Sequence, residues 1–366
     1  MSMLEQINTW NLQNLNYAAK KQIIKGLEEQ RDEDACYSLI EFLYDDHKPI
    51  QELAMDTLAN IGTTEVMGGL LPLLHENDAR VKNMAMEVIR EIAYDRISLL
   101  VTFLEYPYEP TRVAIADLLG LIGNPDAVEP LIASLKDTSP HVRSSALASL
   151  GKLADDRAVF AIENLLATES ESWVIFSCIK SLERIGGKRA IRILLELLKK
   201  DDEFILAAAI ESLGEIGNAE IIPIILNAIS HFSDSHLSGS ITGRVNRALI
   251  SILQRNVSAN LLKQPTQLSK KSRNDLVSFF SSCAGSNLDI RTRAQAIEFL
   301  GELKAEESLD DLTRIVPNGP PMLQSAAAKA LGNIGGDPAR SLLLQLSLSP
   351  DSNTRTAAQE SLRKLA

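Results

Sequence analysis

The chain has 366 residues, of which 48 are Asp or Glu and 37 are Lys or Arg, so its formal net charge is −11 at pH 7. This acidic balance argues against nucleic acid as the main partner, because phosphate binding requires clustered Lys and Arg. Aromatic residues make up only 5% of the chain while Ala and Leu are plentiful, which favours helices over β-sheet sandwiches. No apolar run approaches the roughly 18 residues that span a membrane, so we expect no membrane partner.

The three cysteines, Cys36, Cys178 and Cys283, lie far apart and form no CxxC pair. An odd number of separated cysteines is typical of reduced thiols in a cytoplasmic chain. The first residues have no basic start followed by an apolar core, so they do not read as a signal peptide. We therefore expect a cytoplasmic protein.

An aliphatic anchor recurs about every 31 residues after an N-terminal segment, residues 1–13, that we expect to cap the array. The anchors are Leu58, Ile89, Leu119, Leu150, Leu182, Leu213, Leu300, Leu331 and Leu362, with a weaker match at Leu249 and a plausible earlier one at Ile24. A period maintained in this way indicates a repeat array, which we expect to occupy residues 1–366 as a single domain.

Each anchor has fixed neighbours. The residue four before it is mostly Ala and the residue three after it is Leu or Ile, so all three share one helix face. A second aliphatic column stands twelve after the anchor, for example at Leu70 and Leu131. The residue four after the anchor is often Gly, which can end a helix in the left-handed conformation. Each repeat is therefore predicted to be two antiparallel helices joined by a short turn.

Segments such as "TRVAIADLLGLIGNPDAVEPLIASL" and "VRSSALASLGKLADDRAVFAIENLL" resemble HEAT repeats, in particular the short type found in phycobilisome lyases and many bacterial proteins. The resemblance implies an all-α fold of the armadillo type, an α-solenoid superhelix of about ten antiparallel helix pairs. It also implies a concave surface lined by second helices, with the binding of a partner protein as its commonest use.

The spacing of the anchors is longer after Leu213, which predicts two loop insertions, at residues 230–244 and 254–271. Long loops in compact arrays are often functional, although simple drift in repeat length explains the insertions equally well. This stretch is the most basic part of an acidic chain, so we take as candidates for binding an acidic partner, or the acidic surface of the chain itself, the residues Arg244, Arg247, Lys270, Lys271 and Arg273.

Aromatic residues interrupt the pattern at two other places. Trp173 and Phe176 flank Ile175, which stands where most repeats have a basic or polar residue, and Tyr106 and Tyr108 lie in a proline-containing turn. Trp and Tyr are enriched in binding hot spots, so these four residues are candidate contacts for a partner protein. The alternative is local repacking of the core.

The basic column seven residues before the anchor includes Arg112, Arg143, Arg293 and Arg355. Acidic residues stand four positions before several members of this column, at Asp78, Asp289 and Asp351. We expect the two sets to form a charged ladder that orders neighbouring repeats and contributes about 0–1 kcal/mol for each exposed pair.

The sequence contains no P-loop, GxGxxG or GxSxG motif, and its five histidines do not form a metal-ligand pattern. We therefore expect no catalytic residue, cofactor or metal site, and a non-catalytic scaffold or adaptor that binds a partner protein on its extended, concave helical surface. The alternative implied by the resemblance is an accessory lyase or other protein-modifying enzyme. Bilin lyases of this type work as pairs of HEAT-like subunits that attach a tetrapyrrole to a cysteine of a phycobiliprotein.

The last anchor, Leu362, is followed by only four residues, so its helix has no predicted companion. Leu362 and Leu365 either close the end of the stack beneath a polar cap or pair with a second copy of the chain. Self-association through this C-terminal helix is therefore a further expectation.

Overall fold

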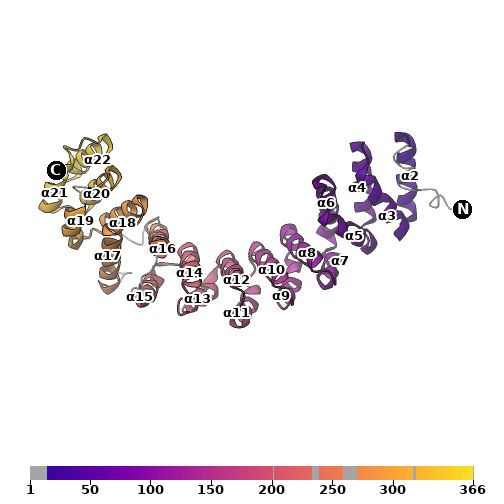
Figure 1. Cartoon of the computed structure of the whole chain (residues 1–366), viewed down its shortest axis with the longest axis horizontal. Coiled ribbons are helices and arrows are strands. Elements are labelled where there is room, and N and C mark those ends of the chain that lie inside the picture. Colours follow the sequence, from indigo (N-terminus) through magenta and orange to yellow (C-terminus); the bar gives the residue numbers. More distant parts are fainter. Residues whose placement is uncertain (1–14, 201, 233–238, 259–269, 316–318, 366) are drawn as a thin grey trace. The chain divides into compact units, whose positions relative to one another are not determined.

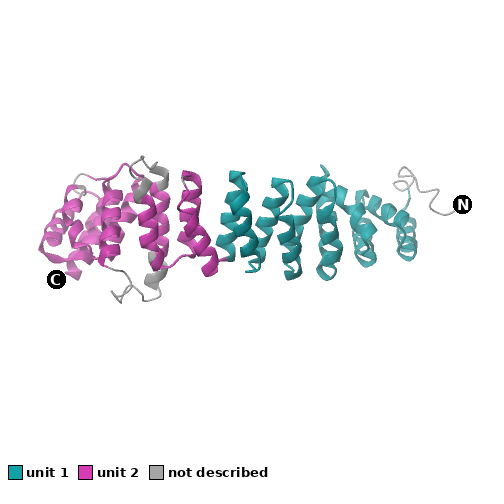
Figure 2. Ribbon diagram, turned by 90° about the horizontal axis from the view of Figure 1, so that it is seen from below, with its two compact units in different colours: residues 1–185 teal, residues 186–366 magenta. Residues whose placement is uncertain are grey.

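The computed structural model describes residues 15–200, 202–232, 239–258, 270–315 and 319–365. Within these ranges the chain forms 21 α-helices joined by turns and short 3₁₀ segments, with no β-strand. The chain divides into two compact units, residues 1–185 and 186–366, which Figure 2 colours separately. The described residues include no helix that is both long and apolar enough to cross a membrane.

Unit 1 alternates long and short helices, which form the two rows visible in Figure 1. The row that carries the anchors contains α2 (Tyr17–Gln30), α4 (Lys48–Ile61), α6 (Ala79–Asp95), α8 (Glu109–Ile122), α10 (Pro140–Leu153) and α12 (Ser172–Ile185). The second row contains α3 (Glu33–Glu41), α5 (Thr64–Leu70), α7 (Ile97–Val101), α9 (Val128–Ser134) and α11 (Ala158–Thr168). Between helices lie η2 (Phe42–Tyr44), η3 (Leu71–His75), η4 (Thr102–Glu105) and η5 (Pro125–Ala127).

Unit 2 repeats the same alternation. Its anchor helices are α14 (Glu203–Ile216), α16 (Gly239–Ser258), α18 (Ile290–Glu302), α20 (Pro321–Ile334) and α22 (Ser352–Lys364). The companion helices are α13 (Gly187–Leu197), α15 (Ile222–Phe232), α17 (Lys270–Gly285), α19 (Leu309–Ile315) and α21 (Gly336–Leu346), with η6 (Ala219–Ile221) and η9 (Glu306–Ser308) before two of them.

The anchor columns form the core of each unit, as the sequence predicts. The anchors from Leu58 to Leu331 are fully buried, and so are the small residues four positions before them, such as Ala54 and Ala327. Burial of each Leu or Ile contributes roughly 1.5–3 kcal/mol, and alanine at the neighbouring position lets the next helix approach. Leu362 in α22, the last helix described, is only partly buried.

The ends of the helices follow the local chemistry. The N-termini are capped by side chains such as Asp289 and Asp351, which accept hydrogen bonds from the amides of Thr292 and Thr354 at 3.0 and 2.7 Å. Helix α4 ends at Gly62, whose φ is 53° and whose amide donates to the carbonyl of Leu58 at 2.9 Å. Gly217 differs, because its φ is −77° and it leaves α14 in an extended conformation.

The first repeat is shifted from its predicted position. Arg31 ends α2 with φ 53° and donates its amide to the carbonyl of Leu27, the same relation that Gly62 has to Leu58. Leu27, rather than Ile24, is therefore the earliest anchor, and its spacing to Leu58 returns to 31 residues. Ile24 is also apolar and is buried on the same helix face, three residues before Leu27.

The two predicted insertions are partly helical. Helix α15 continues to Phe232 and α16 begins at Gly239, so both cover parts of residues 230–244. In the same way, α16 and α17 cover parts of residues 254–271. The remainder of each insertion, and the predicted cap at residues 1–13, lie outside the described residues. A single array over residues 1–366 stays a prediction.

Candidate functional site

The charged ladder exists, but its acidic partners differ from those predicted. Arg112 of α8 pairs with Asp137, with Nε–Oδ2 2.8 Å and Nη2–Oδ1 2.9 Å. Arg143 of α10 pairs with Glu169 in the same two-armed way, at 2.8 and 3.0 Å. Both acids belong to the turn that precedes the next anchor helix, so each pair joins neighbouring repeats. Acids four residues before the column, such as Asp289, instead cap their own helices.

The ladder also holds two of the turns in place, including the one that carries Tyr106 and Tyr108. Arg112 donates from Nη1 to the carbonyl oxygens of Tyr106 and Pro107 at 3.0 and 3.2 Å. Arg143 donates in the same way to the carbonyl of Asp137 at 3.0 Å, just before α10 begins. The turn before α8 and the turn before α10 are therefore fixed by arginines of the helices that follow them.

Hydrogen bonds from the arginines keep the two acids of the ladder ionised. Burial alone would raise the pKa of Asp137, but the bonds from Arg112 and from the Ser139 amide outweigh it, and the pKa is lowered. Burial also opposes ionisation of Glu169, and the hydrogen bonds from Arg143 and the Glu171 amide again leave its pKa lowered. These pairs therefore remain charged at neutral pH.

Exposed aromatic residues lie at two places in unit 1, in the turn before α8 and at the start of α12. We define the aromatic surface as Tyr106, Tyr108, Trp173 and Phe176 together with the rings of His75 and His141. The His75 ring lies edge-on to Tyr108 with centroids 5.9 Å apart, and the His141 ring lies against Trp173 with centroids 5.0 Å apart. The Lys180 Nζ stands 5.9 Å from the centre of the Phe176 ring. Trp173 and Phe176 are 40% and 48% exposed, whereas Ile175 between them is buried, so only Ile175 is part of the core.

A groove opens between the two histidines of this surface. This His-flanked groove has a volume of about 570 Å³, and its apolar side chains include Leu74, Met86, Val113, Leu118 and Leu121. His75, Lys82, Glu109, Asp117 and His141 supply its polar groups. Residues of α6, α8 and α10 thus contribute to one concavity within unit 1, in the size range of sites for single organic ligands, about 300–1,000 Å³.

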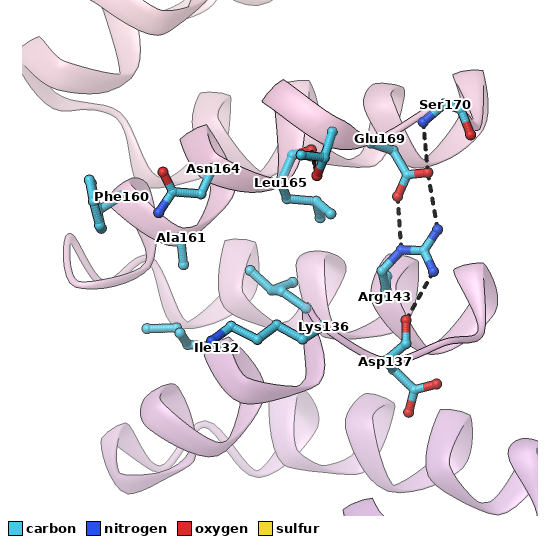
Figure 3. Close-up of a pocket in the computed structure, with 12 residues that line it drawn as sticks. Ile132, Lys136, Asp137, Arg143, Phe160, Ala161, Asn164, Leu165, Glu169 and Ser170 are labelled. Atoms are coloured by element: carbon cyan, nitrogen blue, oxygen red, sulfur yellow. Dashed lines mark hydrogen bonds and ion pairs between the residues drawn. The ribbon is translucent and has the colours of Figure 1, made fainter.

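A second groove lies between α9 and α11 on the companion row of unit 1. This α9–α11 groove has a volume of about 630 Å³ and is lined by apolar side chains that include Ile132, Leu165 and Phe160. Figure 3 shows Arg143 at one end, held between Glu169 and the main-chain oxygen of Asp137, and Phe160 with Asn164 at the other.

The predicted basic residues of unit 2 do not form one unpaired patch. Arg244 pairs with Glu211 at 3.0 Å, and Arg273 pairs with Glu307 while donating to the carbonyl of Leu303 at 3.1 Å. Both arginines therefore tie neighbouring repeats together, as Arg112 does in unit 1. Arg247, Lys270 and Lys271 are exposed.

The sequence prediction missed His75 and His141 as members of the site. His141 stands nine residues before its anchor Leu150, and the same position holds Pro110 and Trp173 in the flanking repeats. This column faces outward on three successive anchor helices, so its unusual composition could have indicated a functional surface. His75 is the last residue of η3, and its contact with Tyr108 has no counterpart in the repeat pattern.

The cysteines of the chain are not placed for nucleophilic chemistry. Cys36, Cys178 and Cys283 are all buried and free. Burial raises the pKa of Cys178 and of Cys283 to about 12, and it also raises that of Cys36. None is a thiolate at neutral pH, the form in which a cysteine attacks.

Pairs of antiparallel helices, joined by short turns and stacked through a repeated core, define an α-solenoid. A family model for HEAT repeats matches residues 97–183, 173–236 and 277–363, which together make up more than half of the chain. The chain therefore belongs to the HEAT-repeat family.

Three known proteins are similar to this chain. A 58-residue segment is 47% identical to the phycocyanobilin lyase subunit alpha of a Picosynechococcus species, covering 16% of this chain and 22% of the relative. The chain thus spans about a fifth of that relative's length. The structure of the complex of CpcE and CpcF of phycocyanin lyase from a Nostoc species matches at 20% identity over 74% of this chain and 94% of the other, but its TM-score of 0.37 supports no conclusion. Kap95p, solved with RanGDP, matches at 14% identity with a TM-score of 0.52 over 100% of this chain and 50% of the other, which supports the helical-repeat fold alone.

The expectation that the chain has no enzymatic activity is wrong in light of the lyase match. It rested on the lack of catalytic motifs and of a metal-ligand pattern in the sequence. Identity of 47% with a subunit of a lyase over 58 residues is instead evidence for a lyase-type relationship.

Proposed function

We propose that this chain is a subunit of a bilin-lyase-type enzyme and that it works by binding a partner protein on the aromatic surface of unit 1. The observation that carries the proposal is the segment 47% identical to a phycocyanobilin lyase subunit. The name of that relative, a subunit alpha, implies at least one further subunit. We therefore expect this chain to act together with a second protein.

The chemistry of such an enzyme places limits on what this chain contributes. Attachment of a bilin adds the thiol of an acceptor protein across a carbon–carbon double bond, which forms one C–S bond and one C–H bond and needs no further reactant. The buried cysteines of this chain, with their raised pKa values, are poor carriers of the bilin. The reacting thiol is therefore the acceptor's, and this chain's part is to bind and orient the reactants.

The aromatic surface is suited to docking a protein. Trp173 and Phe176 are large and exposed, and Tyr106 and Tyr108 stand on a turn that Arg112 already holds in place. Large rigid side chains lose little conformational entropy on binding, so a surface fixed in advance binds with less ordering cost. Contacts of this kind account for much of the binding energy at protein interfaces.

Other parts of the proposal concern location and further partners. We expect the chain to work in the cytoplasm and without nucleic acid. We also expect Arg247, Lys270 and Lys271 to contact acidic groups of a partner.

Self-association through α22 also stays a prediction. Light scattering at high concentration tests it, because a monomer at every concentration would contradict it.

The test of the proposed function is an omission experiment. Purified chain, a second HEAT-like lyase subunit, phycocyanobilin and an apo-phycocyanin acceptor are mixed, and the covalent adduct on the acceptor is measured by intact mass spectrometry. We expect an adduct in the complete mixture and at most a small fraction of it when this chain is left out. An equal yield without the chain would refute a lyase-type role.

A further inference from the structure

We infer that the His-flanked groove of unit 1 is the binding site for the bilin itself, a linear conjugated tetrapyrrole with carboxylate side chains. This inference rests on the proposed function and goes beyond it, because it assigns the bilin to a defined groove on this chain. Its support comes from three features: the shape of the groove, its available hydrogen-bond donors, and its position beside the aromatic surface.

The shape of the groove suits a long, flat ligand. Its volume of about 570 Å³ matches a single organic molecule rather than a folded partner. Apolar side chains from three helices, among them Met86, Val113 and Leu121, supply a surface for the pyrrole rings. At its flanks the imidazoles of His75 and His141 are each backed by an aromatic ring, which holds them in position.

Three side chains of the groove can donate hydrogen bonds to the carboxylates of a ligand. The two acids that line it already accept hydrogen bonds from serine hydroxyls: Glu109 from Ser139 at 2.8 Å, and Asp117 from Ser145. By contrast, within the described part of the chain the structure gives no side-chain hydrogen bond or ion pair to His75, Lys82 or His141. These three groups are thus available to donate to the carboxylates of a bilin.

The α9–α11 groove does not offer the same combination. It is slightly larger, but Arg143, the arginine at its end, is already held by Glu169 and by the carbonyl of Asp137. Its remaining lining cation is Lys136, and no imidazole lines it. A carboxylate ligand therefore has fewer available donors there than between His75 and His141.

The position of the His-flanked groove connects the two proposed activities. His141 lines the groove and also packs against Trp173, a member of the aromatic surface. A bilin in the groove would lie next to the place where we propose that the partner protein docks. The acceptor thiol could then reach the bilin without release of either reactant.

The test is a titration of the 366-residue chain with phycocyanobilin, in which binding is measured by visible absorbance and by quenching of Trp173 fluorescence. A Trp10→Phe background leaves Trp173 as the only tryptophan, because the chain has two. Leu121→Asp introduces a negative charge into the groove at a side chain that is 51% exposed, so the fold should tolerate it. Leu344→Asp is the matched control, because Leu344 is 54% exposed and lies in unit 2.

We expect Leu121→Asp to weaken bilin binding at least tenfold and Lys82→Glu to weaken it severalfold, while Leu344→Asp binds like the wild type. Equal dissociation constants for the wild type and Leu121→Asp would overturn the inference, as would no binding by the wild type, alone or with the second subunit. If Leu121 is required for binding but the omission experiment shows no dependence on this chain, the groove stands and the lyase role fails. If adducts depend on the chain but bilin binding ignores Leu121, the lyase role stands and the groove fails.

Discussion

Arg112 and Asp137 lie 25 residues apart in the sequence and form a two-armed ion pair between neighbouring repeats, with both N–O distances below 3.0 Å. Lys20 and Asp45 form the corresponding pair of the first repeat at 2.6 Å, and Arg143 and Glu169 that of a later one. In each case a cation seven residues before an anchor meets an acid in the following turn. These three pairs therefore each join one repeat of unit 1 to the turn of the next, which is why their removal should affect the stack and not only one helix.

The Arg143→Ala variant should be clearly destabilised. Its partner Glu169 has only 3% of its side chain exposed, so the substitution leaves a buried carboxylate without its cation. Loss of one partner of a buried pair costs roughly 3 kcal/mol, read as a lower midpoint in urea unfolding. Arg157→Ala is the control, because Arg157 is 48% exposed and its partners Asp155 and Glu129 are 26% and 66% exposed, and we expect less than about 1 kcal/mol. Equal effects of the two substitutions would refute a special role for the ladder.

The ladder predicts a loss of stability in acid. The pKa values of Asp45, Asp137 and Glu169 are lowered in the folded chain, so these acids stabilise it fully above their unfolded values of about 4. This contribution is lost as the pH falls through the lower folded values. Urea midpoints should change little between about pH 7 and 5 and fall steeply below about pH 4. In the Arg112→Ala variant the urea midpoint should fall less steeply below about pH 4, because Asp137 has lost its cation. A fall as steep as that of the wild type would contradict the role of this pair in acid stability.

Gly120→Ala should be destabilised because neighbouring anchor helices touch at this position. A Cβ at Gly120 would lie 2.7 Å from the Cα of Ser149 in the next anchor helix, which forces the two helices apart. Such overpacking costs about 1–3 kcal/mol. Gly26→Ala is the control: Gly26 lies within α2, and beyond the adjacent backbone of that helix no atom lies within 4 Å of the added carbon, so helix propensity should stabilise that variant by up to about 1 kcal/mol. Thermal unfolding of both variants measures the difference.

The repeat pattern could be predicted from the sequence because burial constrains the residues that form it. Anchors such as Leu119 and small residues such as Ala146 recur at constant spacing since each must fill the same space between helices. The acid of the ladder also occupies a fixed column, because Asp137 and Glu169 each stand 13 residues before the anchor of the following repeat, Leu150 and Leu182. Tyr106 occupies the same position before Leu119, so the column is acidic only in some repeats and was not recognised as part of the pattern.

Only part of the candidate site could be predicted from the sequence. Trp173 and Phe176 stood out by residue type alone. His141 and Trp173 belong to neighbouring repeats, and their contact depends on how the two helices are placed in space, which the sequence does not show. The residues that depart from the repeat pattern are the informative ones for function, because the pattern itself serves the core.

The cysteines should be inert in the folded chain. Burial raises the pKa of Cys178 and Cys283 to about 12, so neither ionises appreciably at pH 8. A disulfide reagent that reports released thiolate should react slowly with native protein at pH 8, and with all three thiols once the chain is unfolded in denaturant. Rapid reaction of two or three thiols in the native chain would show that these sites open readily.

The most direct test of the proposed role compares initial rates of bilin transfer to apo-phycocyanin, with the second lyase subunit present. The Trp173→Ala, Phe176→Ala double variant removes the centre of the aromatic surface, and Phe160→Ala removes an exposed aromatic residue of the α9–α11 groove as a control. Hot-spot residues contribute about 2 kcal/mol or more, so we predict at least a tenfold slower transfer for the double variant and a rate within twofold of the wild type for the control. Equal rates for all three proteins, or no transfer by the wild type, would contradict the account.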